Sequence, residues 1–341
     1  MEPNPLRQAL AILDTDRPLP AERLQEALRF VMQGTAAEAD IASLLVALHR
    51  RGEGIDEVTA GAQVLREFMT RIPISRRPVT DTCGTGGTGA GLFNVSTTAA
   101  IVAAACGIRI AKHGNRRITS RSGSADVLAE LGVDVDADSE VVARSIDAVG
   151  IGFCFAPTAH PAMRHVGAVR RSLAHPTLFN LLGPLCNPAS AERQVLGVGR
   201  AELMAIFPEA LRRLGTERFL VLHAEDGLCE LSCAAPTRVA IGLDGSIDEQ
   251  IWTPETFGLS TRPWSDAIVD SPTASAALIR RVLAGEAGAP RDLVLLNAAA
   301  AIWLDDPRQN PADAAERAAE AIDSGAAAVK LDELVRASRR S

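Results

Sequence analysis

The chain has 341 residues, of which 47% are hydrophobic and 23% are charged, and its formal net charge is −7. These proportions are typical of a globular protein with a sizeable core. The acidic balance disfavours a general nucleic-acid binder, which is usually basic. The sequence contains no tyrosine and few other aromatic residues, so we do not expect a ligand that is held mainly by stacking.

Signals for export and membrane insertion are missing from the sequence. The first residues, MEPNPLRQALAIL, lack the basic and apolar regions of a signal peptide. No run of about 18 apolar residues predicts a membrane span. The six cysteines form no CxxC pair. We therefore expect a cytoplasmic protein with reduced thiols and no membrane partner.

Residues 1–72 have a helical pattern, with apolar residues such as Leu24, Leu28 and Val31 at helical spacing. Thr35 and Glu38 have the spacing of a capping box that starts a helix. After Pro73 the pattern alternates, with strands expected at 77–82, 108–112 and 218–223 and helices at 96–106, 124–131 and 311–338. This alternation predicts an α/β fold in which helices cover a sheet.

A glycine-rich segment, DTCGTGGTG at 81–89, follows the first expected strand. Its glycines allow backbone N–H groups to converge on one point, as in phosphate sites, and the helix after it adds its positive N-terminal end. A tight turn without a ligand is one alternative. A dinucleotide fingerprint is another, because Gly84, Gly86 and Gly89 fit GxGxxG. That motif expects an acidic residue about 20 positions later, and Lys112 stands in that region. The lack of GK[ST] excludes a Walker motif.

Residues 112–126 contain four cations and four hydroxyls in an otherwise acidic chain. The expected strand before this segment and the helix after it place it at the carboxyl end of a strand, where open α/β sheets bind ligands. Lysine suits a phosphate, and serine hydroxyls complete its coordination. A solvated loop is the alternative.

Several motifs occur in a fixed order between about residues 79 and 200: GTGG, FNVSTTAA, AKHGNR, SGSADVLAELG, FAPTAHPAMRHVGAVRR, FNLLGPLCNPA and QVLGVG. In these motifs and in their order, the chain resembles the anthranilate phosphoribosyltransferase family. The resemblance implies an α/β fold of the nucleoside phosphorylase/phosphoribosyltransferase type. A small all-helical domain (1–73, joined in space by roughly 165–182) would stand beside a larger α/β domain (74–341) with a mainly parallel sheet, usually in a homodimer.

The resemblance also implies an activity. The family transfers phosphoribose from phosphoribosyl diphosphate to anthranilate and releases diphosphate, a step of tryptophan biosynthesis that uses Mg²⁺. Lys112 and Ser124 would stabilise the transition state. The residues expected to bind phosphoribosyl diphosphate are Gly84, Thr85, Gly86, Gly87, Thr88, Asn94, Ser96, Thr97, Lys112 and Ser124. Those expected to bind anthranilate are His113, Asn115, His160 and Arg170, and those expected to bind metal are Ser96 and Glu230.

Two positions depart from the family pattern. The loop usually reads GTGGDG, and here Thr88 replaces its acidic residue. The later acidic pair usually reads DE, and here Cys229 stands at the Asp position before Glu230. Because a neutral thiol is a poor ligand for Mg²⁺, we expect weakened metal affinity. A diverged non-catalytic or nucleic-acid-binding relative, and a transferase or phosphorylase with another acceptor, are the alternatives.

Overall fold

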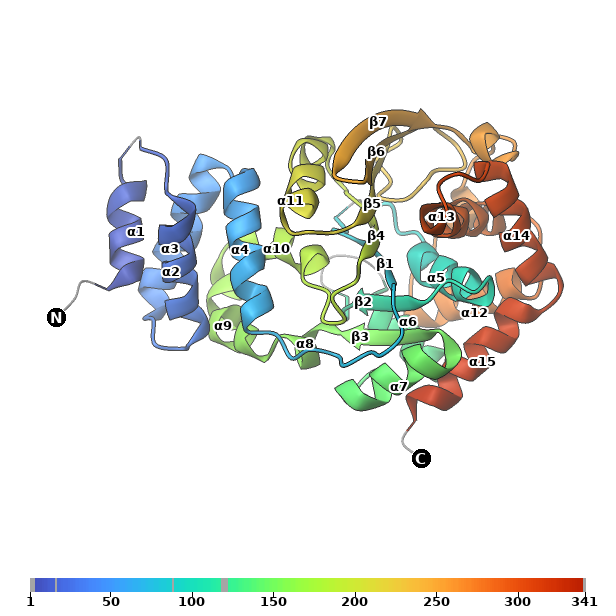
Figure 1. The fold of residues 1–341 in the computed structure, drawn as a ribbon, viewed down its shortest axis with the longest axis horizontal. Coiled ribbons are helices and arrows are strands. Elements are labelled where there is room, and N and C mark those ends of the chain that lie inside the picture. The colour runs from blue at the N-terminus through green and yellow to red at the C-terminus, as the bar shows by residue number, and fades with distance from the viewer. Residues whose placement is uncertain (1–3, 16, 88, 118–121, 340–341) are drawn as a thin grey trace.

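The computed structural model of the chain describes residues 4–15, 17–87, 89–117 and 122–339. A helical region at the N-terminus lies beside a larger α/β region (Figure 1). The helical region contains α1 (Pro5–Leu13), α2 (Ala21–Met32), α3 (Glu38–Arg51) and α4 (Ile55–Glu67).

The helices of this region bury their apolar faces against one another and against later parts of the chain. Leu24, Leu28 and Val31 are buried, as their spacing on α2 predicts. Val166 of α9 (Arg164–Ser172) and Leu178 of α10 (Leu178–Leu182) belong to the same apolar cluster. Residues about 100 positions later in the chain thus pack into the helical region.

A seven-stranded sheet forms the centre of the α/β region. Its strands are β1 (Thr80–Gly84), β2 (Ile110–Gly114), β3 (Ile151–Phe155), β4 (Arg193–Gly197), β5 (Arg218–Ala224), β6 (Thr237–Leu243) and β7 (Ser246–Trp252). Their order is β3-β2-β1-β4-β5-β6-β7. The first five in this order are parallel, whereas β6 and β7 are antiparallel. The predicted α/β class with a mainly parallel sheet is confirmed.

Helices cover both faces of the sheet. Alternate side chains of β5 therefore pack into two different apolar clusters. Leu220 and Leu222 pack into the cluster with α5 (Val95–Ala105) and α13 (Ala289–Asp305). Phe219 and Val221 pack into the cluster with α11 (Phe207–Arg213) and the helical region. Figure 1 shows the C-terminal helices on the side away from α1–α4. The remaining helices are α6 (Ser124–Glu130), α7 (Ser139–Val149), α8 (Ala156–Ala159), α12 (Pro272–Leu283), α14 (Pro311–Asp323) and α15 (Ala326–Ser338).

Two local predictions were wrong. Thr35 caps no helix: Ala37 is the N-cap of α3, and the Thr35 hydroxyl donates to Phe30 O at 3.0 Å. The strand expected from residue 77 begins only at Thr80, and Pro78 has no N–H to donate to a ladder. The helical stretch expected at 311–338 is present as two helices, which Gly325 separates with a left-handed φ of 78°.

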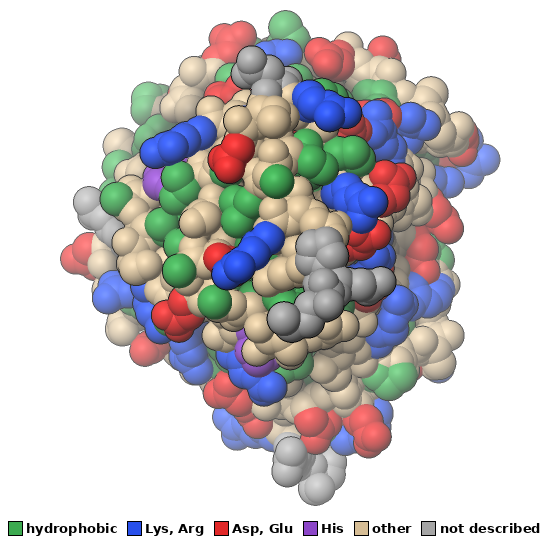
Figure 2. All heavy atoms as spheres, turned by 90° about the vertical axis from the view of Figure 1, so that its left-hand side faces the viewer, with side chains coloured by type: hydrophobic (Ala, Val, Ile, Leu, Met, Phe, Trp, Pro, Cys, Tyr) green, Lys and Arg blue, Asp and Glu red, His purple; other side chains and the backbone are tan. Residues whose placement is uncertain are grey.

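Figure 2 looks onto the outer end of the helical region and shows hydrophobic side chains among charges of both signs. Leu10, Ile12 and Ala42 are among the apolar residues of this region that are only partly buried. A mixed surface of this kind is unlike the continuous basic face of a nucleic-acid binder. Within the described ranges, the structure contains no helix of the length and hydrophobicity that a bilayer span requires.

Candidate active site

The glycine-rich loop leaves the carboxyl end of β1, which lies between β2 and β4 in the sheet. Three of its glycines have positive φ angles: 65° at Gly86, 85° at Gly87 and 67° at Gly89. Other residues rarely adopt these angles. The Thr85 N–H donates to Gly197 O at 2.9 Å, and the Thr85 hydroxyl accepts from Gly199 N–H at 3.0 Å. Thr85 therefore anchors the loop on β4. Thr88 lies outside the described residues.

Lys112, on β2, is only 3% exposed. Its ammonium donates to Thr82 O at 2.6 Å and to Ser96 Oγ at 3.4 Å. It forms no direct ion pair with a carboxylate of the described residues. Burial lowers the pKa of Lys112, and the charges of Asp81 and Glu230 act in the opposite direction. A buried cation in this situation is suited to an anionic ligand such as a phosphate.

The N-terminus of α5 is open. Asn94 is the N-cap residue, yet its side chain makes no capping hydrogen bond. The first N–H groups of a helix have no partner within the helix, and a capping side chain normally satisfies one of them. The Thr97 hydroxyl is buried and has no hydrogen-bond partner in the described part of the chain. Ser96 and Thr97 therefore present unused donors at the positive end of the helix.

Asn115 directly follows β2, and Ser124 is the first residue of α6. The Ser124 hydroxyl donates to Asn115 O at 3.3 Å. A Cβ atom on Gly114 would lie 2.1 Å from Ser124 Oγ, so the approach of these two segments requires glycine. Asn115 Oδ1 accepts the Arg116 N–H at 2.8 Å, and its amide hydrogens have no hydrogen bond to a described residue. These polar groups adjoin the strand end that carries Lys112.

His113 and His160 form a buried pair with ring centroids 5.3 Å apart. Nε2 of His113 and both ring nitrogens of His160 have no hydrogen-bond partner in the described ranges. Burial and, to a smaller extent, the neighbouring His160 lower the pKa of His113 to about 3. Burial also lowers the pKa of His160 to about 4. Both rings are therefore neutral at pH 7.

This pair makes stability depend on pH. We expect the free energy of unfolding to fall as the pH decreases from 6.5 towards 4, because the ordinary pKa of 6.5 lies above both folded values. Over that range the unfolded chain binds protons that the folded chain excludes, at up to about 2.7 kcal/mol per pH unit for two histidines. Urea unfolding at several pH values measures the slope. A His113→Gln/His160→Gln variant should have a flatter dependence, and His49→Gln should not. Equal slopes for all three proteins would contradict the prediction.

Arg170 lies on α9, outside the cluster around Lys112. Its guanidinium carbon is 5.8 Å from the centroid of the Phe179 ring, and burial lowers its pKa. It makes no ion pair with a described carboxylate, and no hydrogen bond or ring contact between described residues joins it to the Lys112 cluster. A ligand that engages both would have to extend from the α/β region to α9.

The residues expected to bind a metal fit that role only in part. Glu230, Ser96 and Cys229 line one small cavity. Burial raises the pKa of Glu230, and the contact with Cys229 lowers it. Cys229 Sγ lies 3.3 Å from Glu230 Oε2, and burial raises the pKa of this thiol well above its usual value. Glu230 and Ser96 offer the oxygen atoms that Mg²⁺ prefers, whereas the neutral thiol does not. Among the described residues, no three His, Cys, Asp or Glu side chains are grouped as in a protein-only metal site.

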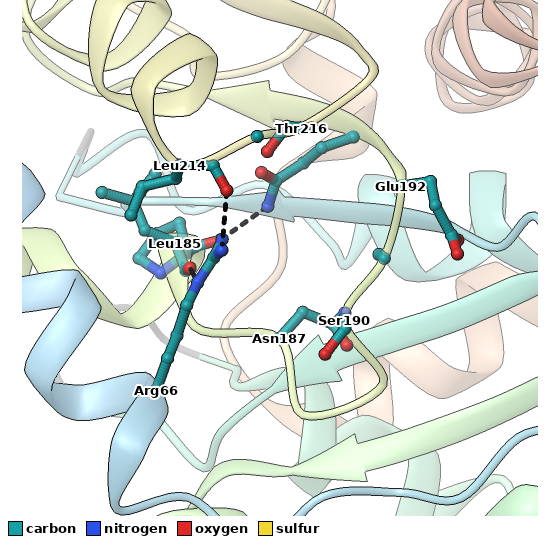
Figure 3. Close-up of a pocket in the computed structure, with 11 residues that line it drawn as sticks. Arg66, Leu185, Asn187, Ser190, Glu192, Leu214 and Thr216 are labelled. Atoms are coloured by element: carbon teal, nitrogen blue, oxygen red, sulfur yellow. Dashed lines mark hydrogen bonds between the residues drawn. The ribbon is translucent and has the colours of Figure 1, made fainter.

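A larger cavity, of about 180 Å³, lies at the amino ends of β4 and β5. Arg66 of α4 enters it and donates to Leu185 O at 2.8 Å and Leu214 O at 3.1 Å (Figure 3). None of the predicted site residues lines this cavity. Arg66 joins the helical region to the α/β region, and the glycine-rich loop lies at the other end of the strands.

Comparisons with known proteins agree with one another over nearly the whole chain. The helical bundle domain of the glycosyl transferase family matches residues 7–69, and the α/β domain of that family matches residues 76–328. An anthranilate phosphoribosyltransferase of Thioalkalivibrio sulfidiphilus is 46% identical over 330 residues, covering 97% of this chain and 98% of the relative. The chain belongs to the anthranilate phosphoribosyltransferase family.

Solved structures of family members have the same fold. The anthranilate phosphoribosyltransferase of Thermus thermophilus is 42% identical and covers 99% of this chain and 100% of its own, with a TM-score of 0.91. The Saccharomyces cerevisiae enzyme, solved in complex with phosphoribosyl diphosphate and Mg, is 27% identical, with coverages of 98% and 97% and a TM-score of 0.89. The same yeast enzyme has also been solved in complex with 4-fluoroanthranilate.

Sequence analysis missed two buried side chains next to these family motifs. Asn297 of α13 accepts from Leu231 N–H at 3.0 Å and donates to Leu231 O at 3.0 Å, and so holds the chain beside Glu230. Its only sequence signal is an amide in the otherwise apolar run 293–304. Ser275 of α12 bonds to Asn94 and has no motif around it. Both residues lie far along the chain from the segments that they support.

Proposed function

We propose that this chain transfers the phosphoribosyl group of phosphoribosyl diphosphate to the amine of anthranilate, giving N-(5-phosphoribosyl)anthranilate and diphosphate in tryptophan biosynthesis. The observation that carries the proposal is a buried ammonium group, Lys112, beside a glycine-rich loop and an uncapped helix N-terminus. All three favour a diphosphate, whose negative charge grows as it leaves.

The proposed reaction is a substitution at C1 of the ribose and needs no oxidant or reductant. The bond between C1 of the ribose and the diphosphate oxygen breaks, and its electron pair leaves with the diphosphate. The nitrogen lone pair of anthranilate forms the new bond to C1, and the nitrogen then passes a proton to the released diphosphate or to water. Lys112, Ser124 and the α5 amides stabilise the leaving group and align it. Their effect is greatest where charge develops and not in the ground state.

We assign the phosphoribosyl diphosphate to Gly84, Gly86, Gly87, Thr88, Asn94, Ser96, Thr97, Lys112 and Ser124, with Thr85 anchoring the loop. We assign the anthranilate ring to a position beside Asn115 and the neutral pair His113 and His160. Their unprotonated ring nitrogens can accept a hydrogen bond from the amine. Arg170, without an ion pair among the described residues, would bind the carboxylate of anthranilate as a bidentate fork.

A Mg²⁺ ion bound with the substrate would offset charge on the diphosphate oxygens. Glu230 and Ser96 are the residues proposed to hold it. Since Cys229 contributes a neutral thiol, most remaining ligands would be substrate oxygens and water, a common arrangement for Mg²⁺. We therefore propose a metal site that is completed by the substrate and is weaker than in relatives with a carboxylate at position 229.

The proposed assembly follows the two regions of the fold. We propose the helical domain as residues 1–73 with roughly 165–182, and the α/β domain as 74–341, with the substrates between them. A homodimer through the helical domain is supported by the partly buried apolar side chains of that region, such as Leu10 and Ile12. A cytoplasmic location is supported by six cysteines that are all free.

The direct test follows the fluorescence of anthranilate after phosphoribosyl diphosphate and Mg²⁺ are added. Consumption of anthranilate with formation of one diphosphate per turnover would support the proposal. Tight binding of phosphoribosyl diphosphate without turnover would favour a non-catalytic relative. Turnover only with inorganic phosphate and a nucleoside would favour a phosphorylase. Size-exclusion chromatography with light scattering tests the dimer.

We expect Cys229→Asp to lower the Mg²⁺ concentration that gives half-maximal activity by about tenfold, because it adds a charged oxygen ligand beside Glu230. Without metal the two carboxylates should repel each other, so Mg²⁺ should raise the thermal midpoint of this variant more than that of the natural chain. Cys106→Asp, at the far end of α5, is the control. An unchanged Mg²⁺ dependence in Cys229→Asp would show that position 229 does not face the metal.

A further inference from the structure

Asn94 is held by two serines from distant parts of the chain. Its Oδ1 accepts from Ser122 Oγ at 2.7 Å and from Ser275 Oγ at 2.8 Å, and its Nδ2 donates to Ser122 O at 3.2 Å. Because a carbonyl oxygen can only accept, the bond to Ser122 O fixes which end of the amide is nitrogen. The orientation of the Asn94 side chain is therefore defined.

Ser275 contributes the more unusual of these contacts. It lies on α12, 181 residues after Asn94, and is fully buried. Its hydroxyl donates to Asn94 Oδ1 and accepts from the Asn94 N–H at 3.1 Å. No other described group bonds to this hydroxyl. Burying a hydroxyl without a hydrogen bond costs free energy, and at Ser275 Asn94 supplies both hydrogen bonds among the described residues.

These contacts keep Asn94 away from the helix that it precedes. Asparagine is among the best N-cap residues, since its oxygen accepts from the second or third N–H of the helix. In α5 these N–H groups belong to Ser96 and Thr97, and Asn94 caps neither of them. Its oxygen is instead occupied by two hydroxyl protons. The N–H groups that would bind a cap thus stay open for another acceptor.

We infer that Ser275 is a positioning residue that keeps the Asn94 side chain off the N-terminus of α5, so that the diphosphate of the substrate binds the open N–H groups in its place. This inference rests on the proposed function, because it names the ligand that replaces the cap. It assigns a role in substrate binding to α12, a helix that contributes none of the predicted site residues.

The test compares Ser275→Ala, Asn94→Ala and the double variant. Without the Ser275 hydroxyl, the Asn94 side chain keeps only its two bonds to Ser122, so we expect it to turn towards α5 more often and compete with the ligand. We expect Ser275→Ala to raise the KM for phosphoribosyl diphosphate about tenfold, with the KM for anthranilate nearly unchanged. Because Ser275 acts through Asn94, adding Ser275→Ala to Asn94→Ala should raise this KM no further. Calorimetry with phosphoribosyl diphosphate should show the same pattern in Kd.

Ser271→Ala is the matched structural control. Ser271 is the N-cap of α12 and accepts from Ala274 N–H at 3.2 Å, so its loss weakens the same helix without touching Asn94. This variant should lose thermal stability and keep its KM. An unchanged KM in Ser275→Ala, or additive effects in the double variant, would overturn the inference. Failure of the natural chain to bind phosphoribosyl diphosphate would instead refute the proposed function.

Discussion

Replacing Lys112 by Met is expected to reduce kcat by about 10²–10³-fold, the usual loss when one donor to a developing negative charge is removed. Methionine keeps the length of the side chain and removes its charge. The Lys112 ammonium is buried and contacts Ser96 Oγ at the start of α5. In Lys112→Met the diphosphate would leave without a cation beside it. Single-turnover kinetics with saturating substrates measures the chemical step directly.

The sequence offers a good control, because Lys330 is its other lysine. Lys330 lies on α15 and bonds to Val149 O and to Glu333, far along the fold from the glycine-rich loop. Lys330→Met should keep kcat. If Lys112→Met folds, as judged by its thermal midpoint, and also keeps kcat, Lys112 does not stabilise the leaving group.

Local chemistry made the glycine-rich loop and several other elements predictable. Positive φ angles favour glycine at positions 86, 87 and 89, because glycine has no Cβ atom that would clash. The helical face of Leu24, Leu28 and Val31 and buried strand β5 were predictable in the same way. In each case neighbours in sequence carry the whole signal, so no knowledge of the tertiary structure was needed.

Other features had a local signal that was overlooked or misjudged. Asp244-Gly245 separates β6 from β7 with φ angles of 51° and 78°, and this dipeptide between two strands is typical of a tight hairpin. The antiparallel end of the sheet could therefore have been predicted. Thr35 and Glu38 show the reverse case: their spacing fits a capping box, yet the helix starts at Glu38 itself, after Ala37.

The supporting residues could not be predicted from sequence, because their partners are distant. Ser275 meets Asn94 across 181 residues, and Asn297 meets Leu231 across 66. Nothing in the residues around them favours these pairs over others. The same limit applies to the low pKa values of His113 and His160, because these follow from burial and not from residue type. Sequence patterns thus indicate candidate ligand-binding groups, and tertiary packing decides what orients them.

Replacing Arg170 by Ala is expected to raise the KM for anthranilate by about 30-fold or more, since a buried charge pair that loses one partner costs roughly 2–5 kcal/mol. The KM for phosphoribosyl diphosphate should change little, because Arg170 makes no contact with the Lys112 cluster. Arg171→Ala is the matched control, since Arg171 is the next residue on α9 and is exposed.

The alternative role for Arg170 is packing, because its guanidinium lies against the Phe179 ring. Aniline, which lacks the carboxylate, separates the two roles. If Arg170 binds the carboxylate, the natural chain and Arg170→Ala should use aniline equally poorly. If Arg170 only packs, the variant should be less stable to heat and should lose activity with both acceptors by the same factor. A common loss of that kind would leave the anthranilate carboxylate without its proposed partner and would move the acceptor site away from α9.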